Sequence, residues 1–235
     1  MARTMTRRKF FSKGREAMLA GGAALASTSM VEARAPRPKL HQGVDYYAKL
    51  GVTPFINAAG TFTVLSASLM PPQVQAAMSR AAQQNVNINE LLVASGEYLA
   101  KRLRCEAALV TAGAASALTL GTAACVTVGN QPAIISIPTD MQGLKNEVIV
   151  QKTHRYEYDH AVRNCGVHFV EVETLEQYEA AFNERTVMAH FFNAAQRGQI
   201  SREDWVRVAH QHGVPCFNDA AADVPPISNL WNYTQ

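Results

Sequence analysis

Residues 187–192 read Val-Met-Ala-His-Phe-Phe, and residues 214–217 read Val-Pro-Cys-Phe. Both runs are short and apolar, which is typical of buried strands. Residues 202–212, which lie between them, are predicted to form a helix. Strands that alternate with helices through short connections indicate a mostly parallel sheet with helices on both faces.

The same alternation extends toward the start of the chain. Strands are predicted at 147–150 and 167–170, with helices at 158–165 and 175–182. Still earlier we predict helices that begin at Pro71-Pro72 and span 89–104 and 114–126, strands at 107–110 and 134–137, and an extended or strand segment at 55–57. No internal repeat or linker interrupts residues 36–235. The sequence therefore predicts one α/β domain, a three-layer αβα sandwich with a mostly parallel sheet.

Composition narrows the class of protein. Of 235 residues, 48% are hydrophobic and 17% are charged, which is enough apolar material for a core and too little charge for a disordered tail protein. Residues 1–35 hold seven Lys or Arg and two Glu, a net charge of +5. The other 200 residues hold 15 basic and 17 acidic side chains, a net charge of −2. A body of this charge gives no support for nucleic-acid binding.

Residues 1–35 have the three parts of a secretory signal peptide. Arg7 and Arg8 begin a basic region, residues 17–31 are weakly apolar, and Ala33-Arg34-Ala35 offers small residues for cleavage. The Arg pair followed by Phe10-Phe11 is similar to a twin-arginine signal. We therefore expect export to the periplasm and no membrane span after removal of the signal; an amphipathic N-terminal helix is the alternative.

Three predicted strands are followed by residues suited to ligand binding, and ligands of open α/β sheets bind at the carboxyl ends of strands. Residues 111–117 read Thr-Ala-Gly-Ala-Ala-Ser-Ala and begin a helix, so they form either an anion site or a tightly packed turn. His154 follows the 147–150 strand, and Asp219 follows the 214–217 strand. An imidazole can stack on a flat cofactor, and a carboxylate can hold a pyridinium N–H.

Several other kinds of site are disfavoured. The 111–117 segment lacks the Gly-Lys-Ser/Thr of a P-loop, and Gly113 alone does not make a Gly-x-Gly-x-x-Gly dinucleotide motif, which disfavours a nicotinamide-dependent oxidoreductase. No His, Cys or Asp cluster has metal-ligand spacing, so no metal site is predicted. Cys105, Cys125, Cys165 and Cys216 form no CxxC pair and are expected to be free, buried thiols.

Five sequence blocks resemble the selenocysteine synthase-like family, L-seryl-tRNA(Sec) selenium transferase and its relatives. The blocks are 56–61 (INAAGT), 111–116 (TAGAAS), 145–155 (KNEVIVQKTHR), 158–161 (YDHA) and 219–226 (DAAADVPP). The resemblance covers residues 43–235. It implies the large domain of a fold type I, aspartate aminotransferase-like enzyme that uses pyridoxal 5′-phosphate.

The resemblance also implies roles for individual residues. Gly113, Ala114, Ala115 and Ser116 would hold the cofactor phosphate, while His154 would stack on the pyridine ring. Asp219 would pair with the ring nitrogen, Asn193 would approach the phenolic oxygen of the ring, and Asn57 would lie near the substrate. A homodimer or higher homo-oligomer is implied by analogy of fold.

The resemblance leaves one part of the site unmatched. The Schiff-base Lys of the family lies in a Ser-Gly-Gly-Lys-like block some tens of residues after the Asp, and the chain ends at Gln235 without such a block. We therefore expect a large domain without its C-terminal part, with no catalytic residue of its own and inactive by itself. The parent enzyme would carry out β-elimination or replacement on a small amino-acid-like substrate, as a lyase or transferase. A catalytically dead binding or structural module that retains the fold is the alternative.

Overall fold

A computed structural model describes residues 43–60, 62–195 and 198–234. The chain divides into two compact units, Met1–Ile56 and Asn57–Gln235. In the first unit, helix α2 (Tyr46–Lys49) begins after Asp45, whose carboxylate accepts a hydrogen bond from the Ala48 amide at 3.1 Å. The predicted signal peptide, residues 1–35, lies outside the described residues.

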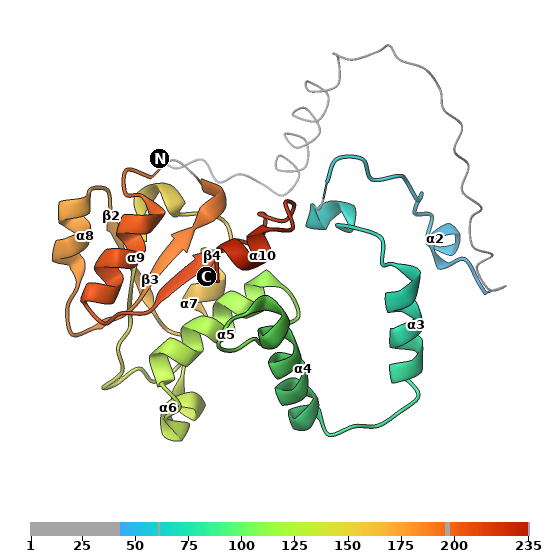
Figure 1. Ribbon diagram of the computed structural model, residues 1–235, viewed down its shortest axis with the longest axis horizontal. Helices are drawn as coiled ribbons and strands as arrows, with labels where there is room; N and C mark the ends of the chain where they lie inside the picture. Colours follow the sequence, from blue (N-terminus) through green and yellow to red (C-terminus); the bar gives the residue numbers. More distant parts are fainter. Residues whose placement is uncertain (1–42, 61, 196–197, 235) are drawn as a thin grey trace, which may run out of the picture. The chain divides into compact units, whose positions relative to one another are not determined.

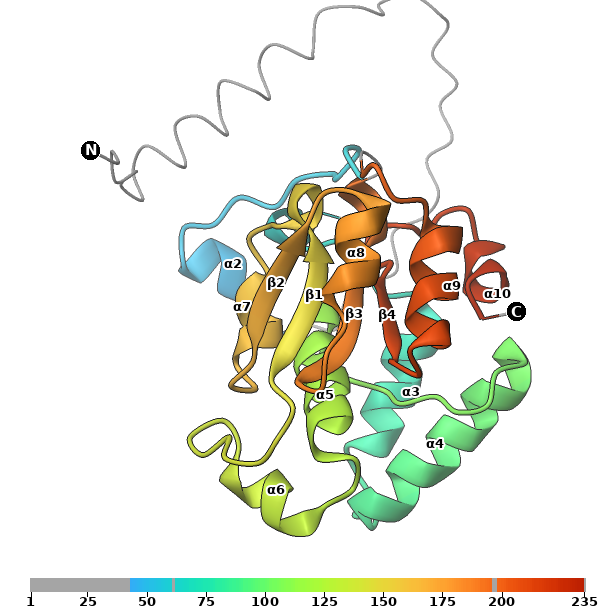
Figure 2. The same ribbon diagram turned by 90° about the vertical axis from the view of Figure 1, so that its left-hand side faces the viewer.

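The second unit contains a four-stranded parallel sheet (Figures 1 and 2). Its strands are β1 (Glu147–Gln151), β2 (His168–Val172), β3 (Thr186–Phe192) and β4 (Cys216–Asp219), arranged in the order β2-β1-β3-β4. Every neighbouring pair is parallel, and β1 is wholly buried. The strands predicted from 147, 167, 187 and 214 are therefore confirmed within two residues at each end.

Helices cover both faces of this sheet. Figure 2 shows α8 (Leu175–Ala181) and α9 (Arg202–Gln211) in front of the strands, with α5 (Ala114–Thr127) and α7 (Asp159–Arg163) behind them. Alternate side chains of β1 and β3 point to opposite faces of the sheet, where they pack in two separate hydrophobic cores. Ile149 and Phe191 pack with Trp205 of α9, whereas Val148 and Met188 pack with Leu118 of α5. This alternation builds the predicted αβα sandwich, and the parallel α/β fold is confirmed.

The order of the strands reverses between β1 and β3. From β1 the chain crosses one face through α7 to β2, whereas from β3 it crosses the opposite face through α9 to β4. The two connections leave in opposite directions, so a crevice is expected where the carboxyl ends of β1 and β3 diverge. Open α/β sheets bind their ligands at such a switch point.

The remaining described elements are helices. They are η1 (Thr63–Leu65), α3 (Pro72–Ala81), α4 (Ile88–Leu103), α6 (Gln131–Ser136), η2 (Lys152–His154), η3 (Asn193–Ala195) and α10 (Asn229–Asn232). Helix α4 is capped by Asn87, whose side chain accepts from the Asn89 amide at 3.0 Å, so the predicted cap at Asn89 is two residues late. Helix α10 contacts the end of α4 through Trp231 Nε1, which donates to the Arg102 carbonyl at 3.1 Å.

Two predicted strands are wrong. Residues 134–137 fall largely in α6, because Asn130 caps this segment and Pro132 occupies its first turn, both of which favour a helix start. A four-residue apolar run does not distinguish a strand from a helix, which explains the error. Residues 107–110 have no regular secondary structure and pair with no strand among the described residues, and Leu109 and Val110 are exposed. The 55–57 segment likewise forms no strand.

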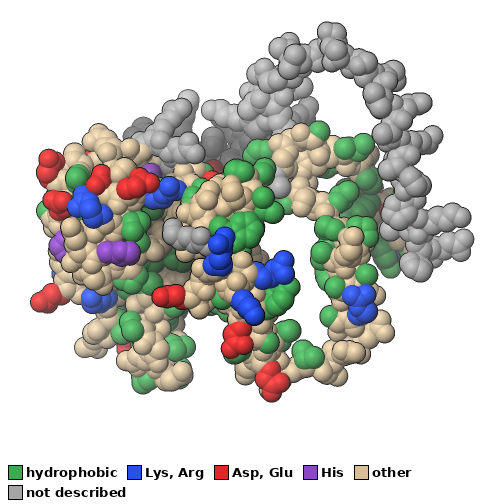
Figure 3. Space-filling model, in the orientation of Figure 1, with side chains coloured by type: hydrophobic (Ala, Val, Ile, Leu, Met, Phe, Trp, Pro, Cys, Tyr) green, Lys and Arg blue, Asp and Glu red, His purple; other side chains and the backbone are tan. Residues whose placement is uncertain are grey.

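Charges of both signs are mixed on the surface. Figure 3 shows basic and acidic side chains interspersed over the part of the molecule that contains α8 and α9. Some form ion pairs, such as Arg207 Nη2 with Asp204 Oδ1 at 2.7 Å. Along the described part of the chain, every helix is too short or too polar to cross a membrane. All four cysteines are free thiols, although only Cys165 is fully buried.

Candidate functional site

The N-terminus of α5 presents unpaired backbone amides. Gly113 precedes the helix, and no side chain caps the first turn. Its φ of 120° lies in the region that favours glycine, and a Cβ added there would meet no atom within 4 Å. The first amides of the helix, at Ala114, Ala115 and Ser116, have no partner within the helix and lie on an exposed turn. Such a turn attracts an anion through its N–H groups and the helix dipole.

Helix α5 runs from the carboxyl edge of the sheet toward its amino edge. The segment after α5 and α6 reaches the amino edge, where a Cβ on Gly166 would lie 2.9 Å from the Pro138 carbonyl oxygen. Midway along α5, a Cβ on Gly121 would lie 2.2 Å from the Phe217 ring of β4. Ala114 is seven residues before Gly121, about 10 Å along the helix axis. The anion site is therefore at the carboxyl edge, on the face of the sheet that α5 covers.

Asp219 ends β4 on this same face. Side chains two residues apart in a strand share a face, so Asp219 points to the side on which Phe217 meets α5. Its carboxylate is buried, and Oδ1 accepts a hydrogen bond from the Ala221 amide at 3.0 Å. Asp219 Oδ2 accepts a hydrogen bond from the hydroxyl of Tyr156. Asp219 and the N-terminus of α5 therefore lie on the same face of the sheet, at its carboxyl edge.

Tyr156 was not among the predicted site residues. It lies between η2 and α7, and its ring stacks on Phe192 with centroids 4.0 Å apart and an interplanar angle of 10°. Phe192 is the register partner of Asp219 across β3 and β4, so Tyr156 also lies on the α5 face. Burial and the hydrogen bond to Asp219 raise the pKa of the Tyr156 phenol above its usual range. The phenol therefore stays neutral and acts as a donor to the carboxylate.

His154 lies on the other face of the sheet. Its ring packs edge-on against Phe191, with centroids 4.5 Å apart, and Phe191 belongs to the core under α9. Its Nδ1 lies 3.2 Å from the Phe192 amide, and its Nε2 lies 3.3 Å from Gln151 Nε2. The Phe192 amide donates to Nδ1, and burial lowers the pKa of His154, which favours the neutral form of the ring. The structure does not bring His154 to the face of Asp219, and its stacking role stays a prediction.

The two predicted asparagines are engaged in separate networks. Asn193 Nδ2 donates to Asp223 Oδ2 at 2.7 Å and to the Tyr233 hydroxyl at 3.1 Å, at the carboxyl end of β3. Asn57 Nδ2 donates to the Gly60 and Ala67 carbonyls at 2.7 and 2.8 Å, which closes a local loop. Asn193 thus lies at the switch point, while the substrate role of Asn57 stays a prediction.

His190 is a second buried histidine that sequence reasoning missed. It is fully buried on β3, and neither ring nitrogen has a hydrogen-bond partner among the described residues. The rings of Tyr156, Phe169 and Phe217 surround it at 6.3–6.5 Å between centroids. Burial lowers the pKa of His190 to about 4, so its ring is neutral at physiological pH. The ring is parallel to that of Tyr156.

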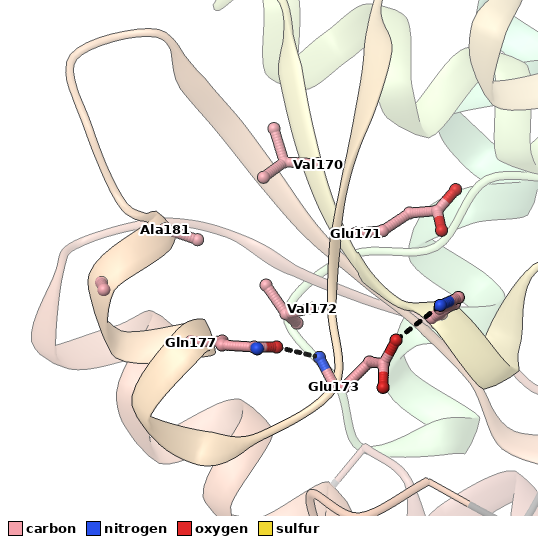
Figure 4. A pocket seen from close by; sticks show the side chains of 8 residues that line it. Val170, Glu171, Val172, Glu173, Gln177 and Ala181 are labelled. Carbon is pink, nitrogen blue, oxygen red and sulfur yellow. Dashed lines mark hydrogen bonds and ion pairs between the residues drawn. The ribbon is translucent and has the colours of Figure 1, made fainter.

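A depression in the surface between β2 and α8 has no such arrangement of groups. Figure 4 shows side chains of β2 and α8 around it. The Lys152 ammonium pairs with Glu173 Oε1 at 2.6 Å. Gln177 Oε1 accepts from the Glu173 amide at 2.8 Å and, in the α8 capping box, from the Thr174 amide at 3.4 Å. The polar groups labelled there already serve the helix cap and a surface ion pair. In the ranges that the structure describes, no group of three or more His, Cys, Asp or Glu could hold a metal ion.

Known proteins resemble this chain over about three quarters of its length. A D-glucosaminate-6-phosphate ammonia lyase from Salmonella typhimurium is 32% identical over 191 residues, covering 76% of this chain and 52% of that protein. A solved structure of D-glucosaminate-6-phosphate ammonia-lyase superposes with a TM-score of 0.71 at 32% identity, covering 77% of this chain and 52% of that one. The fold is that of fold type I pyridoxal-phosphate enzymes.

A second curated relative is a 5′-C-glycyluridine monooxygenase-decarboxylase from a Streptomyces species. It is 29% identical over 191 residues, covering 75% of this chain and 48% of that protein. No protein-family model matches the chain. The chain spans about half the length of the curated relatives that it matches.

Pyridoxal 5′-phosphate is the cofactor of enzymes with this fold, and the residues of the site fit it. The amides of Ala114, Ala115 and Ser116 would hold the phosphate, and the Asp219 carboxylate would accept the ring N–H. When bound, the cofactor withdraws electrons from the substrate carbon next to the amine. Asp219 would favour this by keeping the ring nitrogen protonated, and the Ala221 amide keeps the carboxylate in position.

Proposed function

We propose that this chain forms the large-domain part of a pyridoxal-phosphate-dependent lyase that acts on a small amino-acid-like substrate. The observation that carries the proposal is the placement of Asp219 and the free N-terminus of α5 on one face of the switch point. The curated relative from Salmonella is named as an ammonia lyase, which supports a lyase over a transferase. Within this class we favour β-elimination or replacement.

Descent from the selenocysteine synthase-like family belongs to the same proposal, on the strength of the five sequence blocks. Synthesis of selenocysteyl-tRNA is disfavoured, because the body of the chain carries a net charge of −2 and so offers little attraction for tRNA. We also propose a homo-oligomer. Large apolar side chains exposed on α4, among them Leu91, Val93 and Tyr98, support a partner for this helix.

We further propose that these 235 residues bind the cofactor without linking it covalently. The four described lysines, Lys49, Lys101, Lys145 and Lys152, are all exposed, and Lys152 is paired with Glu173. No lysine is therefore placed to form a Schiff base at Asp219 in the part of the chain that the structure describes. This favours reversible binding by this chain, as in a domain without its catalytic lysine or in a binding module.

Replacement of Asp219 by Asn tests the cofactor site. An amide cannot hold the ring nitrogen in its charged form, and a charge-assisted hydrogen bond contributes about 1.5–3 kcal/mol. We expect Asp219→Asn to weaken binding of pyridoxal 5′-phosphate roughly tenfold or more, measured by absorbance titration and equilibrium dialysis. The wild-type chain should release its cofactor on dialysis even after treatment with borohydride.

The matched control is Asp204→Asn, which removes an exposed carboxylate that pairs with Arg207 on α9. It should leave cofactor binding unchanged. Equal binding by the Asp219 variant and the wild type would remove Asp219 from the site. A cofactor fixed to the wild-type chain by borohydride would contradict reversible binding and would point to one of its own lysines.

Export by the twin-arginine route is a separate proposal, supported by the order of the three signal-like parts in residues 1–35. We expect the full chain to accumulate in the periplasm in a shortened form. Replacing Arg7 and Arg8 together by Lys should retain it in the cytoplasm, because the arginine pair is the feature that the receptor reads. Fractionation followed by immunoblotting measures this, and an unchanged distribution would argue against this route.

A further inference from the structure

Tyr156 lies flat across the carboxyl ends of two strands. Its ring covers Phe192 at the end of β3 and is parallel to that of His190, with centroids 6.5 Å apart and an interplanar angle of 10°. Its hydroxyl reaches the end of β4, where it donates to Asp219 Oδ2. One side chain thus connects the aromatic surface of the switch point with the carboxylate of the candidate site.

The turn that carries Tyr156 is held by charged neighbours. Arg155 Nε donates to Asp159 Oδ2, and the other oxygen of Asp159 accepts from the Tyr156 amide at 3.4 Å. The guanidinium of Arg155 also pairs with Glu171 and lies 4.7 Å from the centre of the Phe169 ring. Two ion pairs and a ring contact therefore orient the backbone on either side of Tyr156.

The Asp219 carboxylate has room for a further donor on each oxygen. Oδ1 accepts from the Ala221 amide, and Oδ2 accepts from the Tyr156 hydroxyl, yet each carboxylate oxygen can accept two hydrogen bonds. A ring N–H placed beside Tyr156 could therefore bind Oδ2 while the phenol keeps its own hydrogen bond. A flat cofactor in that position would face the Tyr156 ring.

We propose that Tyr156 is the residue on which the cofactor ring stacks, and that its hydroxyl orients Asp219 toward the ring nitrogen. This inference rests on the proposed function, because it assumes that pyridoxal 5′-phosphate occupies the site. The sheet geometry supports Tyr156 over His154. Tyr156 packs on Phe192, on the face of Asp219 and α5, whereas His154 packs on Phe191, on the opposite face.

If Tyr156 stacks on the cofactor, His154 has a structural role. Its ring lies between Gln151 at the end of β1 and the Phe192 amide of β3. Gln151 in turn accepts from the Ile200 amide at 3.0 Å and donates to the Ile200 carbonyl at 3.1 Å. His154 therefore joins the ends of the two strands at the core, and its loss should affect folding more than cofactor binding.

Titration of the full chain with pyridoxal 5′-phosphate separates these roles. Tyr156→Ala removes the stacking contact with the cofactor ring, so it should weaken binding roughly tenfold. Tyr156→Phe keeps the ring and loses the hydroxyl, so it should weaken binding only a few-fold and restore most of the induced circular dichroism of the bound cofactor. His154→Gln should lower the urea midpoint while folded protein binds the cofactor as the wild type does.

The control substitution is Tyr158→Ala, two residues along the same segment, where the side chain is half exposed and has no hydrogen bond to Asp219. Inorganic phosphate, used as a competitor, reports on the α5 N-terminus alone and should bind equally to wild type and Tyr156→Ala. This comparison distinguishes loss of the ring contact from general damage. If Tyr156→Ala unfolds, Tyr156→Leu serves the same purpose.

Three outcomes would overturn the inference. Wild-type affinity in Tyr156→Ala would exclude a stacking role, and tighter binding by Tyr156→Phe would show that the phenol competes with the ring nitrogen for Asp219. Loss of affinity in His154→Gln alone would return the stacking role to His154. A wild-type chain that is folded and binds no cofactor would instead overturn the proposed function on which the inference rests.

Discussion

Trp205→Ala is expected to lower the free energy of unfolding by about 3–5 kcal/mol, the usual cost of deleting a fully buried aromatic side chain. Trp205 of α9 has no exposed surface. It stacks on Tyr178 of α8 with ring centroids 3.8 Å apart and an interplanar angle of 3°. The Tyr178 hydroxyl also donates to the Trp205 carbonyl at 2.8 Å. Truncation would therefore leave a cavity between both helices and β3, measurable by urea unfolding followed by circular dichroism.

The other tryptophan is the matched control. Trp231 of α10 is half exposed and makes one hydrogen bond, to the Arg102 carbonyl. Trp231→Ala should cost about 1 kcal/mol, the typical contribution of a single hydrogen bond. Equal losses in the two variants would mean that the core between α8, α9 and the sheet does not dominate stability.

The sequence predicts this core well because its strands are continuous apolar runs. Residues 147–150 and 187–192 are Val- and Phe-rich segments bounded by polar residues, and both are strands of the sheet. The same criterion fails at 134–137, where the run is equally apolar but Asn130 and Pro132 favour a helix start. Local composition identifies apolar segments, whereas capping residues determine which kind of element they form.

The candidate site was predictable only where it comes directly after an apolar run, as Gly113 and Asp219 do. His154 ends the 3₁₀ turn η2 that follows β1, and Tyr156 comes after this turn, which breaks the alternation of faces. Counting residues from Val150 therefore cannot tell which of the two aromatic side chains shares a face with Asp219. His190 was missed for a different reason, because it lies inside an apolar strand.

The buried, unpartnered state of His190 predicts a large effect of pH on stability. The folded state lowers its pKa to about 4 from an ordinary 6.5, mainly through burial. Between these values the unfolded chain binds more protons than the folded chain, so stability falls as the pH falls from about 6.5 to 4. A shift of this size corresponds to roughly 3 kcal/mol at pH 4. Nearby Asp219 and Asp159 oppose the shift, and His154 adds to it.

His190→Leu removes this titration while keeping an apolar side chain of similar size on β3. We expect the variant to gain about 3 kcal/mol relative to wild type between pH 7 and pH 4, measured by urea unfolding at several pH values. The burial of His154 also lowers its pKa, so some acid sensitivity should persist in the variant.

The control is His210→Gln, an exposed position on α9, whose pH profile should match that of the wild type. The free energy of unfolding could also change with pH in the same way in His190→Leu and in the wild type. That result would mean that the His190 ring gains a hydrogen-bond partner that stabilises its charged form. The neighbours of the His190 ring are the aromatic rings of Phe169, Phe217 and Tyr156. Asp219, the carboxylate whose charge acts most strongly on His190, would therefore be that partner. Asp219 would then be shared between His190 and the cofactor ring, and the affinity for pyridoxal 5′-phosphate would fall with pH in the wild type but not in His190→Leu.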